Sequence, residues 1–164
     1  MKRLILIRHA KSSWENMGLS DFDRPLNKRG ILNADFMSNK LSKKIELVDA
    51  FFSSSSKRTI LTSKFFIDKI KVNRDKIYYM DNLYHASSNY LIEFISSLKN
   101  SFSNVICVGH NPGFTDISNY FLGDLFYNVP TCGIIIIDFK VENWKNVNQK
   151  NGKLYYKIFP KDFK

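Results

Sequence analysis

Short apolar runs alternate along the chain with longer segments in which apolar side chains recur at helical spacing. The runs predict strands at residues 3–7, 47–52, 76–80, 104–108, 133–139 and 153–158. The longer segments predict helices from Asn27, a capping residue, to about 45, then at 57–70, 89–99 and from Pro112 to about 122. The polar stretch 11–24 between the first strand and the first helix predicts a loop.

Strands and helices therefore alternate up to the last helix, and two further strands follow it. This order is typical of an α/β protein, because parallel strands are joined by helices that cover the faces of the sheet. A chain of 164 residues has the usual size of one domain. We expect a single domain over 1–164, a three-layer α/β/α sandwich with a mostly parallel central sheet of about six strands.

Composition and hydropathy narrow the class of protein. A hydrophobic fraction of 44% and a charged fraction of 24% exclude collagen, coiled coil and wholesale disorder. The longest aliphatic run, 134–137, is far shorter than the roughly 18 residues of a membrane span. Only four apolar residues precede Arg8, too few for the hydrophobic region of a secretory signal. The sequence therefore predicts a cytoplasmic protein with no membrane partner.

The sequence gives no sign of a disulfide framework, a metal site or a nucleic-acid-binding motif. Cys107 and Cys132 are expected to be reduced and buried. The three histidines lack metal-ligand spacing, so no metal or cofactor is expected. The net charge is +10, and the segment 140–164 holds seven lysines. They are scattered, so we interpret them as a solvated surface, with docking of acidic proteins as a hypothesis; nucleic acid is not expected as a partner.

Polar side chains suited to catalysis follow the predicted strands at the point where each strand ends. The first four strand ends carry, in order, Arg8 and His9, Ser54 and Arg58, His85, and His110 and Asn111. Because the carboxyl ends of parallel strands meet at one edge of the sheet, we expect the three histidines and two arginines among these residues to face one cavity. No acidic residue is expected among them.

Two arginines and two or three histidines around one cavity, without acids or metal, are typical of an oxyanion site. Arginine forks bind phosphate oxygens in pairs and stabilise the charge of a phosphoryl group in transfer. Neutral histidine is a competent nucleophile toward phosphorus. The residues alone therefore indicate phosphoryl transfer through a phosphohistidine, with sulfate or carboxylate binding as open alternatives.

Three motifs resemble those of the histidine phosphatase superfamily, whose fold is phosphoglycerate-mutase-like. They are Leu6-Ile-Arg-His-Ala-Lys-Ser-Ser13, Ser54-x-x-x-Arg58-x-x-x-Thr62 and Val108-Gly-His-Asn-Pro-Gly113. The alanine in place of the glycine of an Arg-His-Gly signature, together with Asp21-Phe-Asp-Arg-Pro-Leu-Asn-Lys-Arg-Gly30, resembles the small SixA-like branch, named for phosphohistidine phosphatases. The resemblance extends from residue 2 to about 139.

This resemblance implies a role for each matched residue. His9 would be the nucleophile that becomes phosphorylated, Arg8 and Arg58 would clamp the phosphoryl oxygens, and His110 would donate to one of them. His85 and Asn111 are expected to line the substrate site, although Asn111 also suits the geometry at the start of a helix. Members of the superfamily need no metal or cofactor.

Several neighbouring residues have supporting interpretations. Ser54 and Thr62 are expected to form hydrogen bonds behind the site, and Asp23 is expected to pair with Arg24 in the loop. Ester-cleaving relatives carry a glutamate after the third strand, where this chain has Leu83-Tyr84-His85. His85 is therefore either a proton donor or a wall of the pocket, and Asp81 is interpreted as a residue at the strand edge.

The missing glutamate favours a phosphohistidine substrate, because the leaving imidazole can be protonated before the P–N bond breaks. We therefore expect a phosphatase acting on protein phosphohistidine and releasing inorganic phosphate. The alternative is a phosphatase of a small phosphomonoester or nucleotide, and a non-catalytic phosphate- or nucleic-acid-binding module is the third hypothesis. Since His9 must be unprotonated to attack, activity should fall at low pH unless the arginines lower its pKa.

Overall fold

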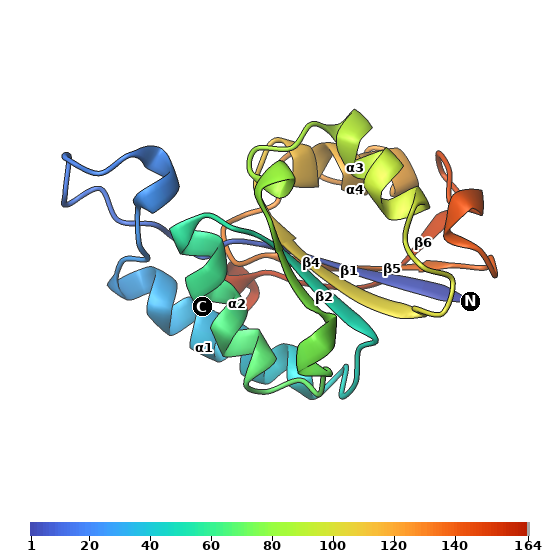
Figure 1. The fold of residues 1–164 in the computed structure, drawn as a ribbon, viewed down its shortest axis with the longest axis horizontal. Helices are drawn as coiled ribbons and strands as arrows, with labels where there is room; N and C mark the ends of the chain where they lie inside the picture. The colour runs from blue at the N-terminus through green and yellow to red at the C-terminus, as the bar shows by residue number, and fades with distance from the viewer. Residues whose placement is uncertain (164) are drawn as a thin grey trace.

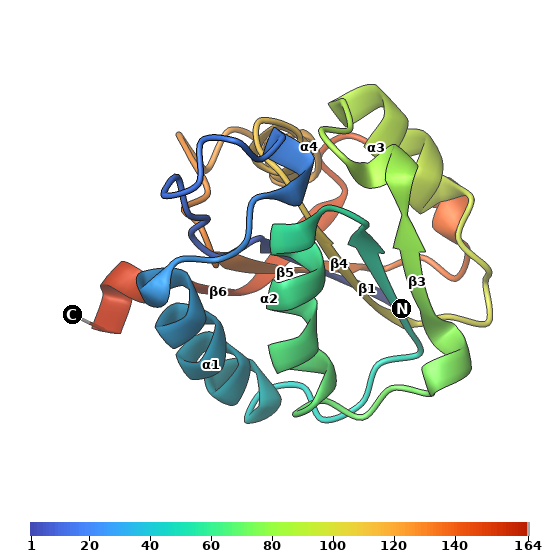
Figure 2. The ribbon, with the colours of Figure 1, turned by 60° about the vertical axis from the view of Figure 1, so that its left-hand side comes forward.

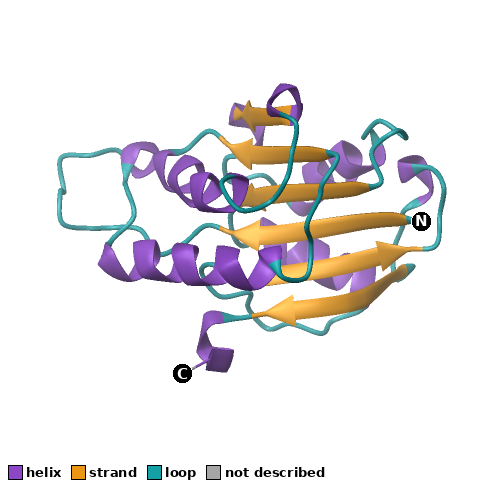
Figure 3. Ribbon diagram, turned by 90° about the horizontal axis from the view of Figure 1, so that it is seen from below, coloured by secondary structure: helices purple, strands orange, loops and turns teal. Residues whose placement is uncertain are grey.

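The computed structural model describes residues 1–163 and is built on a six-stranded sheet with the order β3-β2-β4-β1-β5-β6 (Figure 1). Lys164, the last lysine of the basic C-terminal segment, lies outside the described residues. The strands are β1 (Lys2–Arg8), β2 (Ala50–Ser54), β3 (Ile77–Met80), β4 (Asn104–Gly109), β5 (Ile134–Phe139) and β6 (Gly152–Ile158). Only β5 runs against the other five (Figure 3). The predicted mostly parallel sheet is confirmed.

Four α-helices cover the sheet: α1 (Lys28–Ser42), α2 (Lys57–Ile67), α3 (Ser88–Ser96) and α4 (Gly113–Leu122). Helices α1 and α2 lie on one face of the sheet and α3 and α4 on the other (Figure 1). This arrangement confirms the expected three-layer α/β/α sandwich. None of the helices in the described part of the chain is long and apolar enough to cross a membrane.

The continuous apolar run of β1 has its physical reason in the strand's central position. β1 pairs in parallel with β4 and antiparallel with β5. Leu4 and Leu6 contribute to the core under α3 and α4, whereas Ile5 and Ile7 contribute to the core under α1 and α2. A strand that is buried on both faces needs apolar residues at successive positions rather than at alternate ones.

Four element boundaries differ from the prediction by three residues, and one of them is the end of helix α3, which lies at Ser96 rather than at 99. β2 begins at Ala50 rather than at residue 47, because Leu47 forms a separate bridge with Lys71, and it continues through two buried serines to Ser54. Helix α2 ends at Ile67, although the apolar pattern continues to Ile70, which is buried after the chain has left the helix. Helix α1 ends at Ser42 rather than at about 45.

The connections between the strands determine which strand ends lie side by side. The chain leaves β1, crosses over through α1 to β2, and later returns to β4, the strand directly beside β1. The carboxyl ends of β1, β2 and β4 therefore lie together, at the edge where ligands bind in open α/β sheets. The segment between β1 and α1 projects from this edge (Figure 1, blue) and passes near α2 and the loop before α3 (Figure 2).

Candidate active site

A pocket of about 250 Å³ opens at the carboxyl ends of the central strands. It is lined by Arg8, His9, Lys11, Ser12, Trp14, Asp21, Arg24, Arg58, His85, His110, Asn111 and Thr131. All the residues that the sequence placed in the site (Arg8, His9, Arg58, His85, His110 and Asn111) therefore border one cavity. The convergence follows from the topology, because each of them lies at or just after the carboxyl end of a strand.

His9 lies directly after β1 and is almost fully buried. Its Nδ1 lies 2.8 Å from the carbonyl oxygen of Ala10, which can only accept, so Nδ1 carries the proton. The Nε2 atom is then the acceptor, and it receives a hydrogen bond from Nε of Arg58 at 3.3 Å. Burial, and to a smaller extent the charges of Arg58 and Arg8, lower the pKa of His9 to about 3 against the opposing hydrogen bond to Ala10. His9 is therefore a neutral imidazole with its lone pair on Nε2.

Arg8, which also lines the pocket, has one guanidinium donor in a hydrogen bond and another without a partner among the described residues. Arg8 donates from Nη1 to the carbonyl oxygen of Val129 at 2.8 Å, and its buried Nε has no hydrogen-bond partner among the described residues. Burial, together with the charge of Arg58, lowers the pKa of Arg8. A buried guanidinium N–H without a partner is costly, and an anionic oxygen would satisfy it. This orphaned donor therefore fits an oxyanion site.

His110 lies after β4 and contacts both Ser54 and Arg58. Its Nε2 is 2.9 Å from the hydroxyl of Ser54, and its Nδ1 is 3.4 Å from Nη2 of Arg58, which can only donate. Burial foremost, with the charge of Arg58, lowers the pKa of His110 to about 2. In this structure Nδ1 is therefore an acceptor, and donation from His110 to a phosphoryl oxygen stays a prediction.

Asp21 also lines the pocket, so the expected absence of acids is wrong. Its carboxylate accepts from Nη2 of Arg58 at 3.0 Å and from the hydroxyl of Tyr84, and its backbone oxygen accepts from Nη1 of Arg58 at 2.6 Å. Burial opposes ionisation, but the hydrogen bonds from Tyr84 and Arg58 outweigh it and hold the pKa of Asp21 well below its ordinary value. The loop brings Asp21 to the site from a position far from any strand end, which is why the strand-end argument missed it.

The expected pairing of Asp23 with Arg24 is also wrong. Arg24 instead forms an ion pair with Asp21, at 3.1 Å from Nη2 to Oδ1. Asp23 accepts from the hydroxyl of Ser20 at 2.7 Å. The short 3-10 turn at Asp21–Asp23 turns the side chain of Asp21 toward Arg24 and Arg58. One carboxylate thus links two arginines of the pocket.

His85 occupies the mouth of the pocket, with its side chain about half exposed. Its Nε2 lies 3.2 Å from Nη2 of Arg58 and 3.6 Å from the carboxylate of Asp21, and its ring stacks on Tyr84 at 4.2 Å between centroids. The backbone φ angle of 49° is in the left-handed region, which non-glycine residues adopt rarely and often at functional sites. Both interpretations of His85, proton donor and pocket wall, fit this placement.

Asn111 borders the pocket, but its amide is engaged with the protein. Its Nδ2 donates to the carbonyl oxygen of Val129 at 3.0 Å, and its Oδ1 accepts from the hydroxyl of Thr115 at 3.1 Å. Val129 is also the residue that anchors Arg8. These contacts fit the structural interpretation of Asn111 at the start of α4 and leave its role in substrate binding a prediction.

The remaining neighbours support the site from behind. The hydroxyl of Thr62 accepts from the backbone N–H of Ala10 at 3.0 Å and donates to the carbonyl oxygen of Arg58 at 2.7 Å, so it ties the two motifs together. Asp81 accepts a hydrogen bond from Ser55 and does not line the pocket. Among residues 1–163, no group of three or more His, Cys, Asp or Glu side chains is arranged to hold a metal ion.

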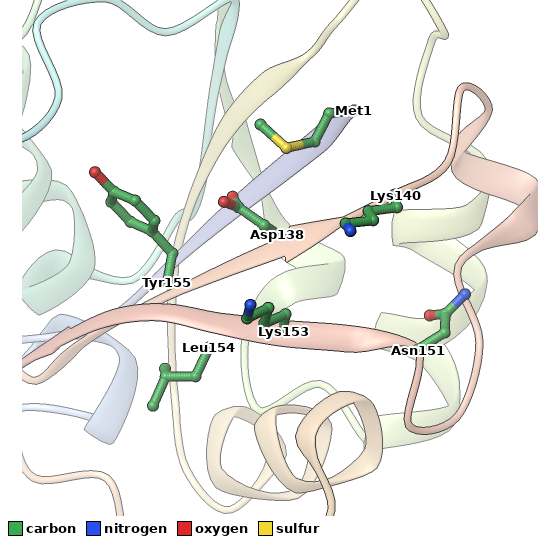
Figure 4. Close-up of a pocket in the computed structure, with 7 residues that line it drawn as sticks. All are labelled: Met1, Asp138, Lys140, Asn151, Lys153, Leu154 and Tyr155. Atoms are coloured by element: carbon green, nitrogen blue, oxygen red, sulfur yellow. The ribbon is translucent and has the colours of Figure 1, made fainter.

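A larger hollow, of about 460 Å³, lies at the other end of β1 (Figure 4). Met1, Asp138 and Tyr155 are among its lining residues. Asp138 is already paired with Arg3 at 2.6 Å, and the guanidinium of Arg3 lies over the ring of Tyr155 at 3.8 Å. The lining includes no histidine or cysteine, so we place the chemistry at the pocket around His9.

Comparisons with known proteins agree with this geometry. The sequence profile of the histidine phosphatase superfamily (branch 1) matches residues 4–83. An uncharacterized chloroplast protein of Arabidopsis thaliana is 27% identical over 165 residues, covering 96% of this chain and 75% of that protein.

Solved structures extend the match to nearly the whole chain. SixA from Agrobacterium tumefaciens has a TM-score of 0.80 and 25% identity, with 97% of this chain and 98% of that chain covered. The protein histidine phosphatase SixA complexed with tungstate has a TM-score of 0.81 and 17% identity, with 99% of both chains covered. The family profile covers just under half of the chain and the solved structures match its fold, so the chain is similar to members of the histidine phosphatase superfamily and shares the fold of the SixA structures.

Proposed function

We propose that this chain is a phosphatase that removes a phosphoryl group through a covalent phosphohistidine on His9, and that its substrate is protein phosphohistidine. One observation carries the proposal. A neutral, buried imidazole borders a cavity together with Arg8 and Arg58, and its lone pair is on Nε2, where it accepts from Nε of Arg58 until an incoming phosphoryl oxygen takes over that donor. A nucleophile that is neutral at pH 7, next to fixed positive donors, is what attack on an anionic phosphoryl group requires.

The first step transfers the phosphoryl group to the enzyme. Nε2 of His9 attacks phosphorus in line, the bond between Nε2 and phosphorus forms, and the bond from phosphorus to the substrate nitrogen breaks. A substrate phosphohistidine protonated on its other ring nitrogen leaves as neutral imidazole, so no proton is needed at the leaving atom. The hydrogen bond from Nδ1 of His9 to Ala10 persists and stabilises the positive charge that the phosphorylated ring acquires.

The second step regenerates the enzyme. A water oxygen attacks phosphorus, His9 leaves as neutral imidazole with the proton still on Nδ1, and the water proton passes to the phosphate product. Arg8 and Arg58 hold the phosphoryl oxygens through both steps, since both line the pocket, Nε of Arg8 has no partner among the described residues, and Nε of Arg58 lies 3.3 Å from Nε2 of His9. His85, at the mouth of the pocket, is placed to orient the attacking water.

Phosphohistidine is favoured over a phosphate ester because no carboxylate stands where ester-cleaving relatives have their glutamate. The position carries His85, and the carboxylate of Asp21 is held ionised by Tyr84 and Arg58, so it has no proton to donate at neutral pH. The matched structures named SixA include a protein histidine phosphatase in complex with tungstate, an oxyanion, which supports the proposal. The absence of a good general acid costs an ester substrate more than a P–N substrate.

A substrate panel tests the proposal. We expect release of inorganic phosphate from a phosphohistidine protein or peptide, with kcat/KM at least tenfold above that for phosphoserine, 3-phosphoglycerate or a nucleoside monophosphate. As a control, Ser55→Ala should keep the substrate preference of the wild type, because the hydroxyl of Ser55 contacts Asp81 outside the pocket. Efficient turnover of one phosphomonoester with little action on phosphohistidine would overturn the proposed substrate and favour the alternative small-molecule phosphatase.

A further inference from the structure

Trp14 is an aromatic side chain held at the mouth of the candidate active site without an assigned role. It lines the same pocket as His9 and Arg58, five residues along the chain from the proposed nucleophile. Its relative exposure is 68%, whereas the second tryptophan, Trp144, is fully buried in the core. A large indole exposed to water at the rim of a small polar pocket is available for contact with a ligand.

The backbone around Trp14 is fixed by contacts to the loop before α1. Ser13 donates its backbone N–H to the carbonyl oxygen of Pro25 at 2.8 Å, and Ser12 forms a β-bridge with Leu26. The carbonyl oxygen of Ser13 accepts from Nη1 of Arg24 at 3.3 Å. The indole therefore follows directly on a segment, residues 12–13, that is tied to the loop before α1, and this anchoring limits the positions in which a ligand meets it.

One face of the indole is already occupied. The guanidinium of Arg24 lies 3.6 Å from the ring centroid, and Arg24 is itself held by the carboxylate of Asp21 at 3.1 Å. A guanidinium over one face, combined with 68% exposure, leaves the opposite face of the indole open to solvent. Indole faces carry negative partial charge and attract flat, electron-poor or cationic rings as well as guanidinium groups.

We infer that Trp14 forms a leaving-group subsite that stacks on the imidazole ring of a substrate phosphohistidine. This inference rests on the proposed function and deepens it, because it says which part of the substrate is recognised besides the phosphoryl group. The pocket of about 250 Å³ takes the phosphoryl group among Arg8, His9 and Arg58, so the ring attached to it must lie at the mouth. A protonated imidazole ring there gains both stacking and cation–π attraction from the indole.

Three P–N substrates separate the parts of this contact. Phosphoramidate carries the phosphoryl group on nitrogen without a ring, N-phosphoimidazole adds the ring alone, and a phosphohistidine peptide adds the chain around it. We expect Trp14→Ala to lower kcat/KM for both ring substrates, relative to that for phosphoramidate, by about three- to tenfold, the size of one aromatic stacking contact. Trp14→Phe keeps an aromatic face and should restore most of the ratio.

Two controls address other roles of Trp14. Because Trp14 contacts Arg24, and Arg24 contacts the carboxylate that binds Arg58, the substitution could loosen the phosphoryl-binding arginines. That effect would lower turnover of all three substrates equally and leave the ratio unchanged. Tyr127→Ala is the matched variant, because Tyr127 is an exposed aromatic residue outside the pocket lining, and we expect it to leave every rate unchanged.

Three results would overturn the inference. An unchanged ratio in Trp14→Ala would show that the indole does not contact the ring. A loss on the peptide but not on N-phosphoimidazole would show that Trp14 contacts the rest of the substrate protein instead. Failure of the wild-type protein to release phosphate from any of the three compounds would overturn the proposed function itself, and this outcome is distinct because it needs no variant.

Discussion

At the scale of single residues, the site depends on which atoms carry protons. His9 and His110 are both neutral, yet they present different atoms, because Ala10 fixes the proton of His9 on Nδ1 and Arg58 donates to Nδ1 of His110. The sequence identified these side chains from their positions after strands. It could not indicate their tautomers, because tautomers depend on hydrogen-bond partners that come from other segments of the fold.

Asp21 leads to a first prediction at this scale. Its carboxylate places a negative charge 3.0 Å from Nη2 of Arg58, beside the proposed phosphoryl site. Asp21→Asn keeps a side chain of the same shape and removes the charge. We expect inorganic phosphate to inhibit the variant about three- to tenfold more strongly, because less repulsion opposes the anion.

The inhibition constant of phosphate measures this effect, and Asp23→Asn is the matched control. Asp23 belongs to the same turn but bonds to Ser20 and does not line the pocket, so its variant should have the phosphate affinity of the wild type. Weaker phosphate inhibition in Asp21→Asn would contradict the prediction. It would mean that the carboxylate acts chiefly by holding Arg58 in place.

At the scale of elements, a close approach between two backbone segments, at Lys11 and Gly30, fixes where residues 11–24 begin. Gly30 lies in the first turn of α1, and its N–H donates to the side chain of Asn27 at 2.8 Å. A Cβ atom at Gly30 would lie 2.1 Å from the carbonyl oxygen of Lys11, two residues after His9. The glycine therefore lets the chain that leaves β1 pass directly against α1.

Gly30→Ala is expected to destabilise the protein and to displace the segment after His9. Overpacking of this kind costs roughly 1–3 kcal/mol of unfolding free energy, which urea denaturation would measure. Gly18→Ala is the control, because the nearest atom to a Cβ there is a side-chain oxygen at 3.3 Å in an exposed turn. Equal stability of the two variants would contradict the close approach.

Most elements could be predicted from the sequence because their signals are local. Asn27 caps α1 as expected, and the apolar run of β1 marks a strand buried on both faces. The path of residues 11–24 could not be predicted, because its position depends on contacts between distant segments, such as Asp21 with Arg58. The start of β2 was also missed, since an isolated bridge at Leu47 has the same apolar signature as a strand.

At the scale of the whole molecule, the active site makes folding sensitive to pH. The folded protein holds the pKa of His9 at about 3, mainly through burial, whereas its ordinary value is 6.5. Between these values the unfolded chain binds the proton and the folded protein does not. Stability therefore falls as the pH falls through this window.

This linkage predicts a difference between two proteins. Between pH 7 and pH 5 the wild type should lose about 2 kcal/mol more unfolding free energy than His9→Gln, which has no titrating group at this position. Urea denaturation at the two pH values measures the difference. A wild type and a variant that lose the same free energy would show that His9 is protonated as readily in the folded protein as in the unfolded chain.

The same depressed pKa affects catalysis. Since His9 stays neutral well below pH 6.5, the dependence of kcat/KM on pH should show no loss attributable to His9 protonation between pH 7 and pH 5. The sequence analysis considered only the arginines as a cause that could lower the pKa of His9. In the structure, burial of the ring lowers the pKa of His9 the most, and the charges of Arg58 and Arg8 lower it less.

The central claim is that His9 carries the phosphoryl group during turnover. Its most direct test is the intact mass of the protein after a rapid quench without acid during reaction with a phosphohistidine peptide, for the wild type and for His9→Ala. We predict a transient gain of one phosphoryl group in the wild type only, followed by release of inorganic phosphate. Phosphate release by His9→Ala at the wild-type rate, or a phosphoryl adduct retained in that variant, would contradict the account.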